Sequence, residues 1–376
     1  MSRPRAHAPS PMGRFGFVLH PLYVADYAKK FPVVRYLPGR LVETAFRAVP
    51  PFEASHITGI VSSTGARAEG WFIGLPWTPR VILGAPPELV YRRLIQAGRI
   101  AERLGAGILG LGAFTKVVGD RGLTVARALE IGVTTGNSLT VATAVEGALL
   151  GAARMGIEIP AARVTVVGAT GAIGAACCQI LARQVGGLIL VARTRDRLDA
   201  LAERLRATAP ARVDVITDVR AAVGAADVVI TVSTATDVLI EPEDLRPGAV
   251  VCDVARPRNV SRHVYERRDD VLVLDGGVIE VPGPVEFGLD FGFPPRSCEA
   301  CMAETILLAL ERRYEDYTLG PDVQLDKVEE IHAMMRTHGF RLSGFRRFER
   351  KITDDEVDAI RRAARTGAAR SVSLGF

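Results

Sequence analysis

The clearest hydrophobic pattern of the chain lies in residues 161–280, where short apolar runs alternate with polar segments of helical spacing. Six of these runs are short and rich in β-branched residues. Nearly continuous apolar strands separated by helices are typical of a parallel sheet that is covered on both faces. The pattern therefore predicts a doubly wound α/β domain. The six runs are RVTVVGA, LILVAR, RVDVIT, DVVITVS, AVVCDVA and VLVLDGG.

Residues 15–160 mix strand-like and helical patterns. A helix is predicted at residues 134–156, because its apolar positions fall on one helical face and Asn137 is suited to be its N-cap. The region therefore predicts a separate N-terminal α/β domain. Its other predicted elements are a strand at 15–20, a hairpin at 56–75, a helix at 86–106, and a glycine-rich strand and loop at 107–118.

These patterns divide the chain into five predicted segments. A helix with cysteines in its first turns follows the parallel-sheet region, and arginine is frequent near the C-terminus. The segments are a disordered lead-in at 1–14, a substrate domain at 15–160, a doubly wound Rossmann domain at 161–280, a helical segment at 281–345 and a basic tail at 346–376.

The composition is that of a globular protein, because 48% of the 376 residues are hydrophobic, enough for two sizeable cores. No uncharged apolar run is long enough for a transmembrane helix. The first residues lack the apolar core of a signal peptide, so we expect a cytoplasmic protein.

The formal net charge is +5, and residues 341–376 hold nine Lys and Arg against five Asp and Glu. The body of the chain is therefore nearly neutral. Nucleic-acid binding normally needs a broad basic face with interleaved aromatic residues, so we expect no nucleic-acid partner. The basic tail fits either the docking of an acidic partner or a solvated surface with no further role.

The five cysteines do not form a recognisable metal or disulfide pattern. Cys298 and Cys301 have CxxC spacing, but no second CxxC or Cys/His pair completes a zinc site. We expect no metal. A buried packing role, a redox pair and a nucleophile remain open for these two residues at this point.

A glycine-rich turn directly follows the first predicted strand of the doubly wound domain, in VTVVGATGAIGAACC. Early glycines let the backbone approach a pyrophosphate, and the last lets the helix pack closely on the strand. The helix N-terminus then offers free N–H groups to phosphates. The predicted cofactor contacts are Gly168, Ala169, Thr170, Gly171, Ala172, Ile173 and Gly174.

The second strand of this domain ends in basic residues rather than in the acidic residue typical of an NAD site. Arg193, Thr194 and Arg195 suit the 2′-phosphate of NADPH, which we therefore expect as the cofactor. The alternative is that Arg195 only begins an exposed helix. Further contacts are predicted at the carboxyl ends of later strands, from Val232, Ser233, Thr234, Gly276 and Gly277.

Cys301 is the candidate nucleophile. The helix is expected to begin near Ser297, with that residue as N-cap, so Cys301 would lie in the first turns. There the helix dipole and free N–H groups lower the pKa of a thiol. A thiolate can take the acyl group of a thioester, and hydride delivery then yields an aldehyde. A small packing residue is the alternative interpretation.

Six motifs along residues 15–340 together resemble those of the long-chain fatty acyl-[acyl-carrier-protein] reductases. The motifs are GLGAFTKVV, TTGNSLTVA, VVGATGAIGAACC, LDGGVIE, ACMAETILLALE and HGF. The resemblance implies NADPH-dependent reduction of a long-chain acyl thioester to a fatty aldehyde through an acylated cysteine, which maps onto Cys301. It also implies that acyl carrier protein, or coenzyme A, delivers the substrate. Cys298 has no counterpart in this pattern.

The resemblance further implies that the N-terminal region, which includes TTGNSLT, forms much of the acyl pocket and one wall of the cleft. Thr135 and Asn137 are then candidates for polarising the thioester carbonyl or touching the nicotinamide, and Lys116 for donating to the oxyanion. Alternatively, Thr135 and Asn137 only cap the helix, and Lys116 lies on the surface.

Two rival functions remain: a shikimate-dehydrogenase-like NADP alcohol–ketone dehydrogenase without a covalent intermediate, and an NADPH-binding protein without catalysis. The stretches DVVITVSTATD and VVCDVARPRNV fit the first rival. The sequence also leaves open an aldehyde-consuming partner enzyme and a weak association with a membrane surface.

Overall fold

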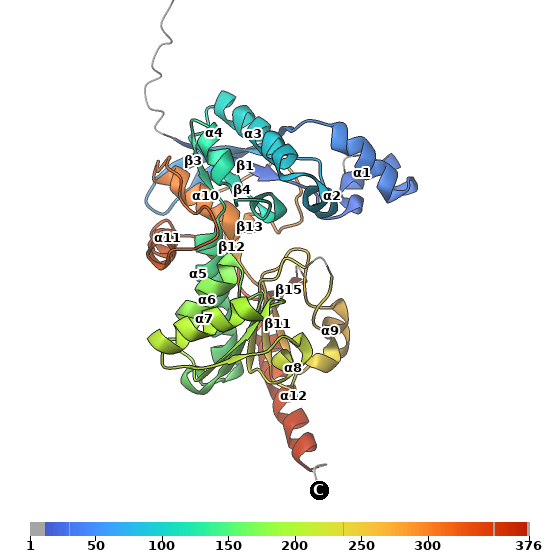
Figure 1. Ribbon diagram of the computed structural model, residues 1–376, viewed down its shortest axis with the longest axis vertical. Helices are drawn as coiled ribbons and strands as arrows, with labels where there is room; N and C mark the ends of the chain where they lie inside the picture. Colours follow the sequence, from blue (N-terminus) through green and yellow to red (C-terminus); the bar gives the residue numbers. More distant parts are fainter. Residues whose placement is uncertain (1–11, 30, 236, 349, 374–376) are drawn as a thin grey trace, which may run out of the picture.

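The computed structural model describes residues 12–29, 31–235, 237–348 and 350–373. Two sheets lie in two lobes, and one long helix, α5 (Asn137–Met155), runs between them (Figure 1). Most of the predicted lead-in lies outside the described residues, and the first strand begins at Gly13, just inside it. Among the described residues, no helix is both long and apolar enough to span a membrane.

The first lobe contains a five-stranded mixed sheet in the order β2-β3-β1-β4-β5. The predicted hairpin is confirmed, because β2 and β3 pair antiparallel across a turn in which Gly65 has a φ of 84°. The remaining neighbours pair in parallel. The strands are β1 (Gly13–Leu19), β2 (Phe52–Val61), β3 (Arg67–Gly74), β4 (Ile108–Leu111) and β5 (Gly132–Thr134).

The helices of the first lobe include the predicted one, which is observed as α3 (Pro87–Arg103), with prolines at its start. A small aromatic group formed by Tyr27, Phe31 and Phe46 holds the segment between β1 and β2 together. The other helices are η1 (Val24–Lys29), η2 (Pro32–Tyr36), α1 (Gly39–Ala48), α2 (Pro79–Gly84), η3 (Ala113–Lys116) and α4 (Leu123–Ala128).

The second lobe confirms the doubly wound prediction. All six predicted runs are strands of one parallel sheet, in the order β11-β10-β9-β6-β7-β8, so the order in which strands are added to the sheet reverses between β6 and β9. Ligands of such sheets bind outside the carboxyl ends of the strands at this reversal. The strands are β6 (Arg163–Val167), β7 (Gly187–Val191), β8 (Arg212–Val215), β9 (Val228–Thr231), β10 (Val250–Asp253) and β11 (Leu272–Asp275).

Helices cover both faces of this sheet, and α5 packs on β9, β10 and α6. The predicted N-cap of α5 is wrong by one residue, because Gly136, with a φ of 68°, holds that position and Asn137 begins the helix. The other helices are η4 (Ile159–Ala161), α6 (Ala172–Leu181), α7 (Arg195–Thr208), α8 (Val219–Gly224), η5 (Pro242–Asp244) and α9 (Arg262–Arg267).

The chain then returns to the first lobe. Helix α10 (Ala300–Leu310) is entirely buried and packs against β1, β4 and α5. A small antiparallel sheet leads into it, made of β12 (Val278–Glu280), β13 (Ser297–Glu299) and β14 (Arg341–Leu342). Helix α11 (Leu325–Thr337) packs beside α5.

The predicted basic tail is not a solvated surface alone, because part of it packs against the body of the protein. Strands β15 (Arg346–Arg347) and β16 (Arg350–Lys351) form a hairpin, and α12 (Asp354–Ser373) packs against α5. Its arginines obscure an apolar pattern, because Ile352, Val357 and Ile360 are buried in the main core. The segment is therefore part of the folded protein.

Candidate active site

A cleft of about 450 Å³ lies at the carboxyl edge of the parallel sheet, between β6 and β9, and reaches the first lobe. It brings together most of the residues that the sequence singles out. Those that line it are Lys116, Asn137, Gly168, Thr170, Gly171, Ala172, Ile173, Arg193, Thr194, Val232, Ser233, Thr234, Gly276, Gly277 and Cys301. Thr135, Ala169, Gly174 and Arg195 do not line it.

The glycine-rich turn has the geometry of a phosphate cradle. Gly168 has a φ of 91°, and a side chain there would press on the backbone of Ser233. A Cβ at Gly174 would collide with the carbonyl of Gly168, so the close approach of α6 to the turn requires glycine. The N-terminus of α6 opens into the cleft at Ala172 and can accept a pyrophosphate.

The end of β7 brings basic groups to the cleft. Arg193 and Thr194 line the cleft, as does Arg197 of the first turn of α7, which the sequence analysis missed. Arg197 Nη2 donates to the carbonyl of Thr170 at 3.4 Å, which holds it beside the glycine-rich turn. Arg195 instead pairs with Asp199 at 2.9 Å along α7.

We expect Arg193→Ser to weaken NADPH binding by about 10- to 100-fold, since a charged hydrogen bond contributes about 1.5–3 kcal/mol. NADH binding should change little, because NADH lacks the 2′-phosphate. Fluorescence titration of both dinucleotides measures this, with Arg204→Ser on the exposed face of α7 as the control. The same titration of Arg195→Ser and Arg197→Ser decides which of the two arginines contacts the cofactor.

Cys301 is the second residue of α10, and its side chain is 4% exposed. The predicted N-cap at Ser297 is wrong, because residues 297–299 form strand β13 and Glu299 is the N-cap. The helix start is fixed by Gly277, whose carbonyl accepts the N–H of Ala300 at 2.8 Å. Cys298 lies in the strand and is fully buried, as a packing residue would be.

The start of α5 lies directly against Cys301. A Cβ at Gly136 would collide with the backbone and Cβ of Cys301, so the N-termini of α5 and α10 meet at this residue. Asn137 lines the cleft there, and its buried Oδ1 accepts no hydrogen bond. An acceptor of this kind fits the carboxamide of a nicotinamide. Thr135 instead donates to the carbonyl of Thr318 at 2.8 Å.

The predicted lowering of the Cys301 pKa is wrong for the protein without ligands. Burial raises the pKa of the thiol to about 12, and the nearby positive charge of Lys116 opposes this effect only in part. The prediction considered the helix dipole and neglected the loss of water around the sulfur, which disfavours a thiolate.

Helix α10 is tied to α5 by Glu304, a residue that the sequence analysis did not single out. The buried carboxylate accepts the N–H of Leu139 at 2.8 Å, the hydroxyl of Thr134 at 2.5 Å and that of Thr318 at 3.0 Å. Glu304 therefore satisfies a free N–H of the first turn of α5 and fixes the two helix starts relative to each other.

A second cavity, of about 480 Å³, adjoins the cleft and is mainly apolar. The two share Ala113, Arg256 and Glu299. The N-terminal region, which the sequence analysis expects to form much of the acyl pocket, supplies most of the lining of this cavity, although its segment TTGNSLT lines only the cleft, through Asn137 and Thr140. The aromatic residues in the cavity walls are Phe17, Tyr23, Tyr27, Phe31, Phe46, Phe52, Phe72, Phe291 and Phe293.

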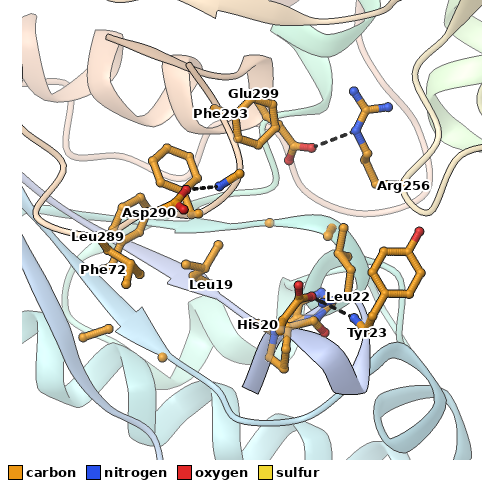
Figure 2. Close-up of a pocket in the computed structure, with 18 of the residues that line it drawn as sticks. Leu19, His20, Leu22, Tyr23, Phe72, Arg256, Leu289, Asp290, Phe293 and Glu299 are labelled. Carbon is orange, nitrogen blue, oxygen red and sulfur yellow. Dashed lines mark hydrogen bonds and ion pairs between the residues drawn. The ribbon is translucent and has the colours of Figure 1, made fainter. Parts of the chain in front are cut away.

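Figure 2 shows this cavity, with the ion pair of Glu299 and Arg256 beside apolar side chains such as Phe72 and Leu289. The loop at residues 289–294 covers it, and its phenyl ring at Phe291 packs against Phe72, with ring centres 5.0 Å apart. No periodic pattern marks this loop in the sequence, which is why it was missed.

Comparison with known proteins gives matches to most or part of the chain. Residues 151–275 match the shikimate / quinate 5-dehydrogenase family model. A long-chain acyl-[acyl-carrier-protein] reductase from Synechococcus elongatus is 30% identical over 309 residues, which are 78% of this chain and 88% of that protein. The aminotransferase PigE from a Serratia species is 30% identical over 359 residues, 93% of this chain but 42% of PigE.

Solved structures are more distant. Glutamyl-tRNA reductase from Methanopyrus kandleri is 17% identical, with a TM-score of 0.29 over 78% of this chain and 60% of that one. L-Tryptophan dehydrogenase from Nostoc punctiforme is 12% identical, with a TM-score of 0.34 over 94% and 88% of the two chains. At such TM-scores these likenesses carry no argument about function.

Proposed function

The chain belongs to the family of long-chain acyl-[acyl-carrier-protein] reductases, and from this premise we propose that it reduces a long-chain acyl thioester to a fatty aldehyde. The nucleotide domain and the family make it an NADPH-dependent reductase. The match to shikimate / quinate dehydrogenases is confined to residues 151–275, so it supports the nucleotide site and not a substrate.

The observation that carries the proposal is the position of Cys301 where an apolar cavity meets the nucleotide cleft. Cys301 lines the cleft, and the next residue along α10, Met302, lines the apolar cavity. An acyl chain in this cavity would have its thioester carbonyl near the sulfur. Each methylene that leaves water contributes about 0.8 kcal/mol, so a long chain would bind mainly through its tail.

The covalent step is a thioester exchange. The Cys301 sulfur attacks the carbonyl carbon, the bond from that carbon to the carrier sulfur breaks, and the carrier leaves as a thiol. Lys116 and the N-termini of α5 and α10 would stabilise negative charge on the carbonyl oxygen. When bound, NADPH would supply the hydride that reduces the carbonyl carbon of the new thioester, and the bond from that carbon to the Cys301 sulfur would then break to release the aldehyde.

NADPH would be held by the glycine-rich turn at its pyrophosphate and by Arg193, Thr194 and Arg197 at its 2′-phosphate. Asn137 and the glycine pair Gly276-Gly277 would face the nicotinamide end. We propose acyl carrier protein as the natural carrier, with coenzyme A as the alternative.

The decisive experiment is intact-mass analysis after incubation with long acyl thioesters in the absence of NADPH. We expect one acyl group per chain, located on the peptide that contains Cys301. Reduction that proceeds without any adduct would favour the direct dehydrogenase, and cofactor binding without turnover would favour a non-catalytic protein.

The apolar cavity predicts a dependence on chain length. Ala54→Phe, in the cavity wall, should raise the KM for a long acyl thioester by about tenfold or more and leave a short one nearly unchanged, because the added ring displaces several methylenes. Steady-state kinetics with a series of chain lengths measures this. Ala45→Phe, on the exposed side of α1, is the matched control.

A further inference from the structure

A carboxylate that neither the sequence analysis nor the comparisons assign touches the candidate nucleophile. Glu299 ends β13 and precedes α10, and Cys301 Sγ donates to Glu299 Oε2 at 3.7 Å. The other carboxylate oxygen, Oε1, lies 3.6 Å from Arg256 Nε. Glu299 also lines both the cleft and the apolar cavity.

The thiol of Cys301 requires a proton acceptor. Burial raises its pKa to about 12, so at neutral pH the sulfur carries its proton until a substrate arrives. Attack on a thioester needs the thiolate, and a base within hydrogen-bond reach can remove the proton during the attack.

Other nearby groups are poorly placed for this task. His20 is buried, one ring nitrogen accepts the N–H of Phe114 at 3.1 Å, and the other lies 3.0 Å from the carbonyl of Pro21. Burial lowers its pKa to about 4. Glu304 has both oxygens engaged by three donors. Lys116, as a cation, stabilises the thiolate but does not take its proton.

We propose that Glu299 accepts the proton of the Cys301 thiol as the sulfur attacks the acyl thioester. The inference rests on the proposed function, since it concerns the first step of that reaction. As the carrier's carbon–sulfur bond breaks, Glu299 returns the proton to the departing sulfur. The exchange needs no oxidant or reductant, and the carboxylate is restored at its end.

Arg256 keeps the carboxylate in place from the loop after β10, and its side chain is 11% exposed. Helix α10 does not depend on the side chain of Glu299, which makes no capping hydrogen bond. Glu299→Gln therefore preserves the shape of the site. Lys116 and Glu304 act electrostatically on Cys301. The other charged residues that line the apolar cavity with Glu299 and Arg256 are Asp26, Arg258, Asp275, Asp290 and Arg346.

The test is the rate of Cys301 acylation in Glu299→Gln, followed by quenched-flow mass spectrometry without NADPH. We expect a decrease of about 10²- to 10⁴-fold at pH 7. If Glu299 took no part in the reaction, its replacement would raise the acylation rate instead of lowering it. The charge of Glu299 raises the pKa of Cys301, so its removal alone would favour the thiolate and speed acylation.

The pH profile separates a base from a structural residue. Between pH 7 and 9 the wild-type acylation rate should be nearly constant, because an internal acceptor takes the proton. In Glu299→Gln the rate should rise about tenfold per pH unit, because only the small thiolate fraction reacts, and that fraction grows toward the pKa of Cys301. A slow variant with a flat profile would overturn the inference.

The matched control is Glu280→Gln, since Glu280 lies in β12, beside β13, and pairs with Arg341 outside both cavities. It should acylate at the wild-type rate. Glu299→Asp retains the carboxylate and should recover part of the rate. If Glu299→Gln no longer bound NADPH, the acylation rate of Glu299→Asp and the pH profile of the wild type would test the inference instead. A wild-type acylation rate that rises tenfold per pH unit would overturn it.

Failure of this inference is distinguishable from failure of the proposed function. If the wild type forms no adduct at any pH, the covalent reaction itself is wrong. If the wild type forms the adduct and Glu299→Gln forms it equally fast or faster, Cys301 remains the nucleophile and Glu299 is not its proton acceptor.

Discussion

Replacing Cys301 with serine should lower the rate of aldehyde formation by at least about 10³-fold and abolish the acyl adduct. Serine has nearly the same shape, so the packing of α10 against α5 is retained. Its hydroxyl is a much weaker nucleophile than a thiol, and the site offers no histidine to activate it, since His20 is engaged by Phe114. Aldehyde production and intact mass measure the two effects.

The control for this variant is Cys298→Ala. Cys298 is buried in β13 and lines neither cavity, so its loss should leave the adduct on Cys301 intact. NADPH binding to Cys301→Ser should match the wild type, which shows that the nucleotide cleft is folded. Aldehyde formation by Cys301→Ser within tenfold of the wild type would contradict the covalent mechanism and support direct reduction.

Replacing Glu304 with alanine should have the largest effect on stability, a loss of about 3–5 kcal/mol in the free energy of unfolding. The carboxylate is fully buried, and its removal leaves the N–H of Leu139 and the hydroxyls of Thr134 and Thr318 without their acceptor. Urea unfolding with an unchanged m-value measures the loss. A loss below about 1 kcal/mol would contradict this account of the helix junction.

Glu304→Gln is the control, because it keeps the volume and one acceptor oxygen, and it should cost much less than alanine. The pH dependence has a defined sign. Burial raises the pKa of Glu304 in the folded protein above its ordinary value, so the folded state holds the proton more tightly than the unfolded chain. This contribution to stability is complete below the unfolded pKa and is lost as the pH rises through the folded pKa.

Local patterns in the sequence were sufficient for the nucleotide half of the site. The six apolar runs and the glycine-rich turn depend on short-range rules, so strand, turn and helix follow from about twenty residues at a time. The basic residues after β7, in place of the acidic residue typical of an NAD site, likewise lie within a few residues of one another. Arg193 and Thr194 do line the cleft.

The other half of the site depends on contacts between distant segments. Glu299 and Arg256 are far apart in sequence and meet only because β13 and the loop after β10 lie at the same cavity. The aromatic walls of that cavity come from β1, β2, β3, the segment between β1 and β2, and the loop at 289–294, and no common period links them. The state of Cys301 was mispredicted for a related reason, since its burial is a property of the whole fold.

Helix α5 has a practical consequence for protein engineering. It is roughly 28 Å long, begins against the backbone and Cβ of Cys301 and then packs along the nucleotide sheet. A chimaera that exchanges the dinucleotide half for that of another enzyme, to change coenzyme preference, cannot be spliced at the obvious boundary near residue 160. The grafted part would have to include α5, and the first turn of this helix would have to fit against Cys301. Otherwise the nucleotide cleft and the nucleophile would no longer be correctly positioned relative to each other.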